Sequence, residues 1–367
     1  MKQELYIGLM SGTSADAVDA ALVDFSASFP HLIAKNRLAL PQALQAKLHQ
    51  LARPGFDEIN QMVEIDKKLG ELFAKAALQV LAKAQIDKAS IQAIGSHGQT
   101  IRHAPYANYP FTLQIADPTI IAARTGIITV ADFRRKDMAL GGQGAPLAPA
   151  FHAAFYKNSQ LDRIILNIGG MANITYLAAN HHNRLIGFDT GPGNTLLDAW
   201  CMQHQQVAFD EGGQWARQGK IITELLTKLL TDNYFQLSYP KSTGKEYFNL
   251  VWLNVRNLQA YRPIDVQATL TELTAMTIAK AIQALTSQAE ILLCGGGAYN
   301  SYLLERLTLA LGNQYICKLI DELGLSADIL EAVAFAWFAK KCLAKEPIDL
   351  TSVTGAKTKA ILGGVYY

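Results

Sequence analysis

The chain has 367 residues, more than one hydrophobic core usually accommodates, so its length favours two domains. Half of the residues are apolar and 17% are charged, a balance that excludes disordered and fibrous chains. Lys and Arg number 33 against 31 Asp and Glu, and because a net charge of +2 attracts neither nucleic acid nor anionic lipid, we expect a small-molecule partner.

The cysteines and the apolar segments indicate a cellular compartment. Cys201, Cys294, Cys317 and Cys342 show no CxxC spacing, which is typical of buried free thiols in a reducing environment. No stretch approaches the roughly 18 apolar residues of a membrane span. The first residues also lack the apolar run of a secretory signal. The sequence therefore predicts a cytoplasmic protein that does not enter a membrane.

The first section of the chain alternates strands and helices. Residues 5–10 and 20–25 are apolar and flank a turn of small polar residues, which predicts an antiparallel hairpin. From Glu58 to Ala84, apolar residues recur at three- and four-residue steps, which indicates a long amphipathic helix lying on a sheet. Further short strands are expected over 91–95, 112–116 and 127–131. This order is typical of an α/β domain.

The same order begins again after a glycine-rich passage at 131–146. Residues 163–179 predict a strand, a glycine turn and a strand. Residues 184–200 predict a strand, a tight turn and a helix that Asn194 or Thr195 caps. The later elements are a helix over 266–287, a strand and glycine turn over 290–300, and a helix over about 327–344 with Ser326 as its N-cap. Two sections that each begin with a hairpin predict a duplicated architecture with a cleft between the halves.

Three glycine turns are candidates for nucleotide binding, because glycine lets backbone N–H groups approach a phosphate. The first turn joins Gly12 to Asp16 and Asp19, and carboxylates beside phosphates imply an intervening Mg²⁺, held mostly through water. The others contain Gly169–Gly170 and Gly295–Gly297. The first is also compatible with an ordinary hairpin turn, and the third with a tight strand-to-helix connection. P-loop and Rossmann motifs are absent from the sequence.

Two hairpin turns followed by a glycine-rich turn resemble the actin, hexokinase and heat-shock ATPase superfamily. Within it, the chain resembles the anhydro-N-acetylmuramic acid kinase family through "MSGTSADAVDAAL", "GSHGQTIRH", "QIADP", "ADFRRKDMALGGQGAPLAPAFH", "NIGGMANIT", "FDTGPGN", "PKSTGKEYFN", "CGGGAYN" and "SVTGA". These segments extend from residue 10 to residue 356. Ala15 and Ala17 stand where the family commonly has Met and Gly.

The resemblance implies an α/β fold of two duplicated ribonuclease H-like (actin-like ATPase) domains with an interdomain cleft. The expected domains are residues 1–130 plus 360–367, and residues 131–359. It also implies a homodimer, with ATP and Mg²⁺ as cofactors and an amino sugar as substrate. The implied reaction opens a 1,6-anhydro ring with water and phosphorylates O6, giving N-acetylmuramic acid 6-phosphate and ADP during peptidoglycan recycling. Another sugar kinase of the superfamily, phosphorylating a free hydroxyl, is the alternative, and an ATP-gated binding module is a third possibility.

The resemblance also implies roles for individual residues. Asp189 is the implied base that deprotonates water, although it would also suit a turn cap. Glu331 is implied to hold that water, although a Glu in a first helical turn also suits the helix dipole. Arg134 is expected to contact the substrate's lactyl carboxylate or a phosphate, and Asn194 to bind substrate. The implied nucleotide site comprises Gly12, Thr13, Ser14, Ala15, Asp16, Ala17, Val18, Asp19, Gly169, Gly170, Gly295, Gly296 and Gly297, with Asp16 and Asp19 holding Mg²⁺ through water.

His97 and His103 lie near Ser96, which is compatible with a Ser-His hydrolase. The segment "GSHG" differs from the GxSxG motif, however, and no acidic partner follows at a recognisable spacing. We therefore expect His97 to be a polar residue of a cleft or a structural residue.

Overall fold

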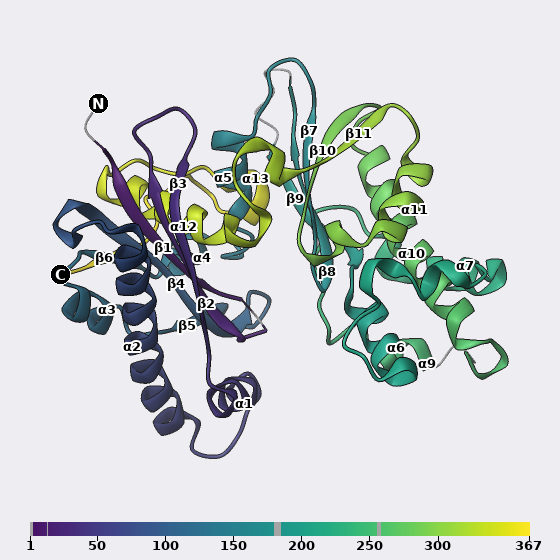
Figure 1. Cartoon of the computed structure of the whole chain (residues 1–367), viewed down its shortest axis with the longest axis horizontal. Coiled ribbons are helices and arrows are strands. Elements are labelled where there is room, and N and C mark those ends of the chain that lie inside the picture. The colour runs from purple at the N-terminus through teal and green to yellow at the C-terminus, as the bar shows by residue number, and fades with distance from the viewer. Residues whose placement is uncertain (1–2, 13, 180–184, 255–257) are drawn as a thin grey trace. The chain divides into compact units, whose positions relative to one another are not determined.

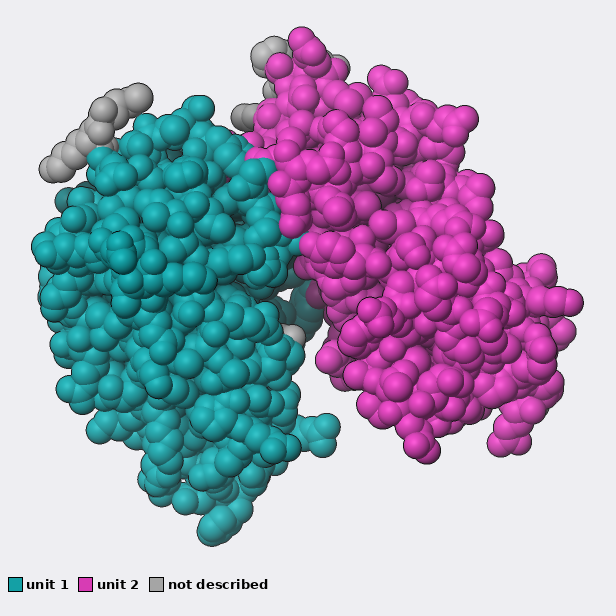
Figure 2. Space-filling view, viewed as in Figure 1, with its two compact units in different colours: residues 1–151, 324–367 teal, residues 152–323 magenta. Residues whose placement is uncertain are grey.

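The computed structural model describes residues 3–12, 14–179, 185–254 and 258–367. These residues form two compact units, shown in different colours in Figure 2. Unit 1 comprises residues 1–151 and 324–367, and unit 2 comprises residues 152–323. Among the described residues, no helix combines the length and the hydropathy that crossing a membrane would require.

Unit 1 is built on a seven-stranded sheet (Figure 1). Its order is β12-β6-β4-β1-β2-β3, and β5 pairs with β4 off this path. β1, β2 and β3 are antiparallel neighbours, whereas β1, β4 and β6 run parallel. The strands are β1 (Leu5–Ser11), β2 (Ala17–Asp24), β3 (His31–Ala39), β4 (Ile91–Ala104), β5 (Phe111–Ile115), β6 (Thr129–Ala131) and β12 (Gly364–Tyr366).

Unit 2 repeats this order in a five-stranded sheet, β11-β10-β7-β8-β9. As in unit 1, three consecutive strands, β7, β8 and β9, are antiparallel neighbours, whereas β7, β10 and β11 run parallel. The strands are β7 (Arg163–Ile168), β8 (Met171–Leu177), β9 (Leu185–Pro192), β10 (Ala289–Cys294) and β11 (Tyr315–Leu319). The repeated order confirms the predicted duplicated α/β architecture.

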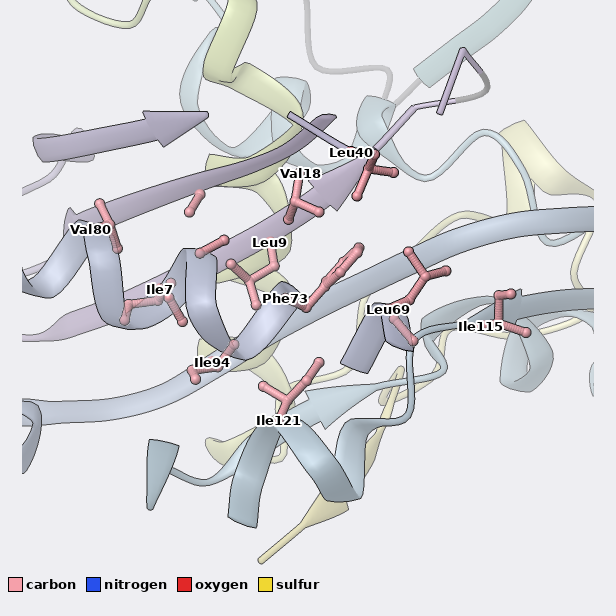
Figure 3. Packing of buried hydrophobic residues seen from close by; sticks show 14 of the residues in the cluster. Ile7, Leu9, Val18, Leu40, Leu69, Phe73, Val80, Ile94, Ile115 and Ile121 are labelled. Carbon is pink, nitrogen blue, oxygen red and sulfur yellow. The ribbon is translucent and has the colours of Figure 1, made fainter. Parts of the chain in front are cut away.

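A long helix, α2, covers one face of the first sheet. It spans Glu58–Ala84, the bounds predicted from its apolar periodicity. Its buried face contributes Leu69, Phe73 and Val80 to a core that includes Ile7 and Leu9 of β1 (Figure 3). The other helices of unit 1 are α1 (Gln42–Leu51), α3 (Pro118–Thr125), α4 (Phe133–Ala139), α12 (Leu330–Leu343) and α13 (Thr351–Thr354), and α5 (Ala148–Phe155) crosses the boundary at 151/152.

Helix α12 packs on the opposite face of that sheet. Side chains alternate between the faces of a strand, so Gly8 of β1 faces away from the core that holds Ile7 and Leu9. A Cβ at Gly8 would overlap the Ala332 carbonyl of α12, and one at Gly95 of β4 would overlap the Phe335 carbonyl. Gly8 and Gly95 are register partners. These two glycines therefore let the α12 backbone lie directly on β1 and β4.

Unit 2 contains two apolar clusters. One packs α10 and α11 on the second sheet, and the other joins α6, α7 and α10. The helices are α6 (Thr195–Gln205), α7 (Thr223–Leu230), α8 (Asn233–Gln236), α9 (Leu250–Asn254), α10 (Pro263–Gln283) and α11 (Ser301–Leu311). The short 3₁₀ helices among the described residues of both units are η1 (Lys88–Ser90), η2 (Glu211–Gly213), η3 (Ala216–Gln218), η4 (Leu258–Ala260), η5 (Gly296–Tyr299), η6 (Ile320–Leu323) and η7 (Ala327–Ile329).

The compact units do not follow the expected domain bounds of 130/131 and 359/360. Residues 131–151 and 324–359 belong to unit 1. The reason is that α12 packs on β1 and β4, while Thr354 hydrogen-bonds Asp137 within the same unit. The helix expected over 327–344 is also divided, into η7 and α12.

The four cysteines are thiols rather than disulfides, as predicted, and Cys201, Cys294 and Cys342 are buried. Cys317 differs from the expectation of burial, because it is only partly buried on β11. β11 pairs with β10 and lies at one end of the strand order of the second sheet.

Candidate active site

Asp189 lies on β9, and neighbouring segments fix its position. Its Oδ2 accepts hydrogen bonds from Ser242 Oγ at 2.9 Å and from the Thr243 backbone N–H at 3.0 Å. The Tyr234 hydroxyl donates to its backbone carbonyl at 2.8 Å. Oδ1 accepts no hydrogen bond from any residue that the structure describes. One carboxylate oxygen is thus anchored, and the other is available to a ligand.

The surroundings of Asp189 favour a proton acceptor that is stronger than an ordinary aspartate. Desolvation raises its pKa above 3.8, and the nearby negative charge of Glu246 acts in the same direction. The hydrogen bonds from Thr243 and Ser242 oppose this shift without cancelling it. A carboxylate with a raised pKa and a free oxygen is suited to taking a proton from water.

The second and third glycine turns meet at one edge of the unit 2 sheet. β7 and β10 are parallel neighbours, so the turns that follow them lie at the same edge. A Cβ at Gly297 would overlap the Ile168 side chain, and Gly295 has a φ of +80°. Asn194 Nδ2 donates to the Ile168 carbonyl at 3.2 Å rather than capping α6. Gly169, Gly170, Asn194 and Gly295–Gly297 therefore gather at one edge of the second sheet.

Lys245 adds a positive charge to this edge. A Cβ at Gly170 would lie 3.4 Å from the Lys245 side chain, so the cation lies over the turn. The spacing of Lys245 in the sequence indicates no role for it. Desolvation raises the pKa of the nearby Asp198 from 3.8 to about 6, and the positive charge of Lys245 opposes this shift. A lysine beside backbone N–H groups is a typical phosphate-binding arrangement.

The first turn follows β1 in unit 1. The Ala15 N–H donates to the Gly12 carbonyl at 3.0 Å, and Gln99 Nε2 donates to the same oxygen at 3.1 Å. Ala15 has a φ of +53°, a conformation that glycine adopts more readily. Thr13 lies outside the described residues.

Several nucleotide-site candidates of this turn have no accessible side chain. Ala15, Ala17 and Val18 are buried, and Ala17 and Val18 pair with β3 through their backbones. Any contact that they make with a nucleotide would use backbone atoms. Ser14, Asp16 and Asp19 keep side chains that a ligand can reach, because none of the three is fully buried.

An arginine lies beside the two aspartates expected to hold Mg²⁺. Arg37 of β3 forms an ion pair with Asp16, and its Nη1 lies 3.6 Å from Asp19 Oδ1. Asp16 Oδ1 also accepts from Ser14 Oγ at 2.6 Å. Both Asp16 oxygens therefore have protein partners, which suits contact with a hydrated Mg²⁺ better than direct ligation. No group of three or more His, Cys, Asp or Glu residues in the described chain forms a metal site.

Glu331 and Arg134 are electrostatically coupled in unit 1. Glu331 is exposed at the start of α12, but the surrounding protein restricts its hydration. This desolvation raises the pKa of Glu331, Arg134 opposes the shift and Asp19 adds to it. Desolvation also lowers the pKa of the Arg134 guanidinium to about 10. Within the described residues the two side chains form no direct ion pair, so a ligand or water can lie between them.

The contacts of His97 are incompatible with a Ser-His dyad. His97 Nε2 accepts from Arg134 Nε at 3.0 Å, and Nδ1 lies 2.9 Å from the Gly98 carbonyl. Both ring nitrogens are thus engaged, and neither contacts Ser96. His103 lies elsewhere on β4, with Nδ1 3.1 Å from Thr112 Oγ1. These contacts therefore favour a structural role for His97 over a catalytic role in a Ser-His hydrolase.

Known proteins resemble this chain over its whole length. The family model for anhydro-N-acetylmuramic acid kinase matches residues 4–367. A relative of that name from Coxiella burnetii (strain Dugway 5J108-111) is 51% identical, with 100% of this chain and 98% of the relative covered. Another, from Shewanella sp. (strain ANA-3), is 50% identical, with 99% of each chain covered.

Solved structures show weaker likeness. Component A of the (R)-2-hydroxyglutaryl-CoA dehydratase of Acidaminococcus fermentans has a TM-score of 0.49 at 12% identity, with 93% of this chain and 100% of that chain covered. The ROK hexokinase of Thermus thermophilus has a TM-score of 0.39 at 17% identity, with 92% and 99% covered. Both TM-scores are below 0.5, so neither likeness bears on function.

The duplicated fold and the full-length match together define the chain as an ATP-dependent sugar kinase. Its relatives are similar over their whole length rather than in one domain. The chain belongs to the anhydro-N-acetylmuramic acid kinase family.

Proposed function

We propose that this protein phosphorylates 1,6-anhydro-N-acetylmuramic acid while opening its anhydro ring. Water adds to the anomeric carbon and gives up a proton, the bond from that carbon to O6 breaks, and O6 takes the γ-phosphoryl group of ATP. The products are N-acetylmuramic acid 6-phosphate and ADP. The observation that carries this proposal is about 50% identity over the full chain to relatives bearing that name.

Asp189 is the proposed base. Its Oδ2 is held by Ser242 and Thr243, which leaves Oδ1 to accept the proton of the attacking water. Attack by water on an anomeric carbon requires such a carboxylate, as in inverting glycoside hydrolysis. Because the γ-phosphoryl group captures O6 as it departs, the reaction does not need an acid to protonate the leaving oxygen. Asp189 then releases its proton to solvent.

Glu331 and Arg134 are the proposed substrate-side partners. Glu331 would hold the attacking water through its carboxylate. Arg134 presents N–H donors to an anionic group, either the lactyl carboxylate of the sugar or a phosphate. Asn194 is proposed to bind substrate, although its Nδ2 already donates to Ile168.

The glycine turns are the proposed nucleotide site. Gly12, Thr13 to Asp19, Gly169, Gly170 and Lys245 would bind phosphates. Gly295–Gly297 would lie against adenosine. Mg²⁺, held through water by Asp16 and Asp19, would neutralise charge on the phosphates.

The experiment that tests this function runs the reaction in ¹⁸O-water. One ¹⁸O atom per turnover should enter the sugar at the anomeric carbon, because an anhydro bridge is hydrolysed. A kinase that phosphorylates a free hydroxyl would leave the sugar unlabelled, and that result would overturn the proposal. ADP release without added anhydro sugar serves as the control for uncoupled ATP hydrolysis.

We further infer from the family a cytoplasmic homodimer that acts in peptidoglycan recycling. Sedimentation of the purified protein should give twice the 40.1 kDa chain mass. A monomer at micromolar concentration would contradict the inferred homodimer.

A further inference from the structure

The contact between His97 and Arg134 defines the tautomer of the histidine. Arg134 Nε lies 3.0 Å from His97 Nε2. A guanidinium group has only donors, so Nε2 must be unprotonated and act as the acceptor. A neutral ring then carries its proton on Nδ1, which donates to the Gly98 carbonyl at 2.9 Å. His97 thus joins β4 to the guanidinium through one specific tautomer.

The surroundings of His97 keep the ring neutral and in place. Its side chain is 5% exposed, and its ring centroid lies 4.6 Å from that of Phe335 on α12. Burial and the positive charge of Arg134 both lower the pKa of His97 well below its ordinary value. At neutral pH the ring is therefore available as a hydrogen-bond acceptor.

A second segment holds the same guanidinium. Arg134 Nη1 donates to the Gly144 carbonyl at 2.8 Å. The Gly144 N–H in turn donates to Asp137 Oδ2 at 2.7 Å, while Asp137 Oδ1 accepts from Thr354 Oγ1 at 2.7 Å. Asp137 is buried, so this support is rigid. His97 and Gly144 therefore fix the orientation of Arg134 from two parts of unit 1.

Part of the Arg134 guanidinium has no hydrogen-bond acceptor among the residues that the structure describes. Among the described residues nothing accepts from Nη2, and Nη1 keeps one N–H beyond its bond to Gly144. Nη2 therefore offers two N–H groups, and Nη1 one, to a carboxylate or a phosphate. Because two supports hold the side chain before a ligand arrives, little rotamer entropy remains to be lost on binding.

We propose that His97 is a positioning residue that directs the unused N–H groups of Arg134, above all those of Nη2, toward an oxyanion of the bound substrates. This inference rests on the proposed function, in which Arg134 contacts a substrate. The oxyanion is either a carboxylate of the sugar or a phosphate of the nucleotide. The Michaelis constants of the two substrates separate these sources.

The first test compares His97→Phe with His97→Gln. Phe keeps a ring against Phe335 but offers no acceptor, whereas Gln carries an amide oxygen near the position of Nε2. In His97→Phe we expect the KM of one substrate to rise about 10-fold, the usual scale for losing a hydrogen bond to a charged group. The sugar KM rises if the oxyanion is its carboxylate, and the ATP KM rises if it is a phosphate. His97→Gln should stay within about threefold of the parent.

A thermal melt of each variant separates loss of positioning from loss of folding. Unchanged constants in a folded His97→Phe protein would overturn the proposal. Equal impairment of the Phe and Gln variants would overturn it as well, because the acceptor would then be irrelevant.

A double-mutant cycle tests whether His97 acts through Arg134. In an Arg134→Met background, His97→Phe should have almost no further effect on the affected KM, since the guanidinium that it positions is absent. Additive effects of the two substitutions would contradict the proposal.

A third measurement reports the tautomer of His97 directly in the full-length protein and requires no substrate. In the full-length protein labelled with ¹⁵N-histidine, the imidazole spectrum at pH 7 should show His97 as the neutral Nδ1–H tautomer, assigned by its loss in His97→Gln. An imidazolium or an Nε2–H tautomer would overturn the contact. Failure of the ¹⁸O assay with the expected tautomer present would instead reject the proposed function and leave the His97–Arg134 contact standing.

Discussion

At the scale of single residues, Asp189 combines an anchored oxygen with a free one. Asp189→Asn keeps the size of the side chain but cannot accept a proton as a carboxylate does. We expect kcat to fall at least about 100-fold, the usual scale for losing a general base. The dissociation constant of ATP should remain unchanged, because the nucleotide turns contain no part of Asp189. Normal turnover by a folded Asp189→Asn protein would show that another group is the base.

The raised pKa of Asp189 also predicts how activity and stability depend on pH. Only the ionised carboxylate can act as a base, so kcat should fall with a midpoint above pH 3.8 as the solution is acidified. Acidification should affect stability in the opposite sense to activity. Because the pKa of Asp189 is higher in the folded state than in the unfolded state, the carboxyl group stabilises the fold at pH values below the unfolded pKa. That stabilisation is lost as the pH rises through the folded-state pKa. At pH 7, Asp189→Asn should therefore melt no lower than the parent. A clearly lower melting temperature would contradict this electrostatic account.

Arg37 provides a residue-scale test of the first turn. Arg37→Met removes the cation beside Asp16 and Asp19, so their negative charges should repel the ATP phosphates and raise the KM for ATP. Stability should change by less than about 1 kcal/mol, because the ion pairs are largely exposed. Arg124→Met is the matched control, since Arg124 forms an exposed ion pair with Glu71. Equal ATP constants in the two variants would remove Arg37 from the nucleotide site.

At the scale of elements, Gly95 sets the distance between β4 and α12. Gly95→Ala would place a methyl group against the Phe335 carbonyl, and backbone cannot move aside as a flexible side chain can. We expect a loss of about 2–3 kcal/mol in the free energy of unfolding, in the range for overpacking a buried contact. Denaturant titration measures it, and kcat should fall too because α12 carries Glu331. Gly55→Ala is the control, since nothing lies within 4 Å of a Cβ there.

The sequence predicts elements well where their apolar pattern is strong. The bounds of α2 match the prediction because its buried face repeats regularly. β3, β11 and β12 were not predicted: β3 is exposed and polar along much of its length, and β12 has three residues. These strands depend on neighbours that are distant in the sequence. Arg37 was missed as a site residue because it lies on β3.

The sequence predicts the motifs of the candidate site but not the contacts between their residues. The glycine turns and Asp189 follow from the sequence and its resemblance, and the structure brings Gly169, Asn194 and Gly295–Gly297 together. The roles of these residues in binding and catalysis stay predictions. The His97–Arg134 bond could not be foreseen, because it joins β4 to α4 between residues that are 37 positions apart in the sequence. No local spacing encodes such a contact.

At the scale of the whole molecule, the apolar cores are separate. Phe73 belongs to the core of unit 1, and Leu307 to a core of unit 2. We expect calorimetry to resolve two unfolding transitions, since each unit has its own core. Phe73→Ala should lower one transition and Leu307→Ala the other, each by an amount equivalent to about 2–5 kcal/mol. If either variant shifts both transitions equally, the units unfold as one.

Unit 2 interrupts unit 1 in the chain, and this order has a consequence during protein synthesis. Residues 152–323 are synthesised, and start to leave the ribosome, before the segment that carries α12 and β12. The second sheet can therefore fold while the face of β1 and β4 that contains Gly8 and Gly95 still lacks its helix. The unit whose synthesis starts first should be the last to mature, and nascent chains stalled before residue 324 should bind chaperones through that uncovered face.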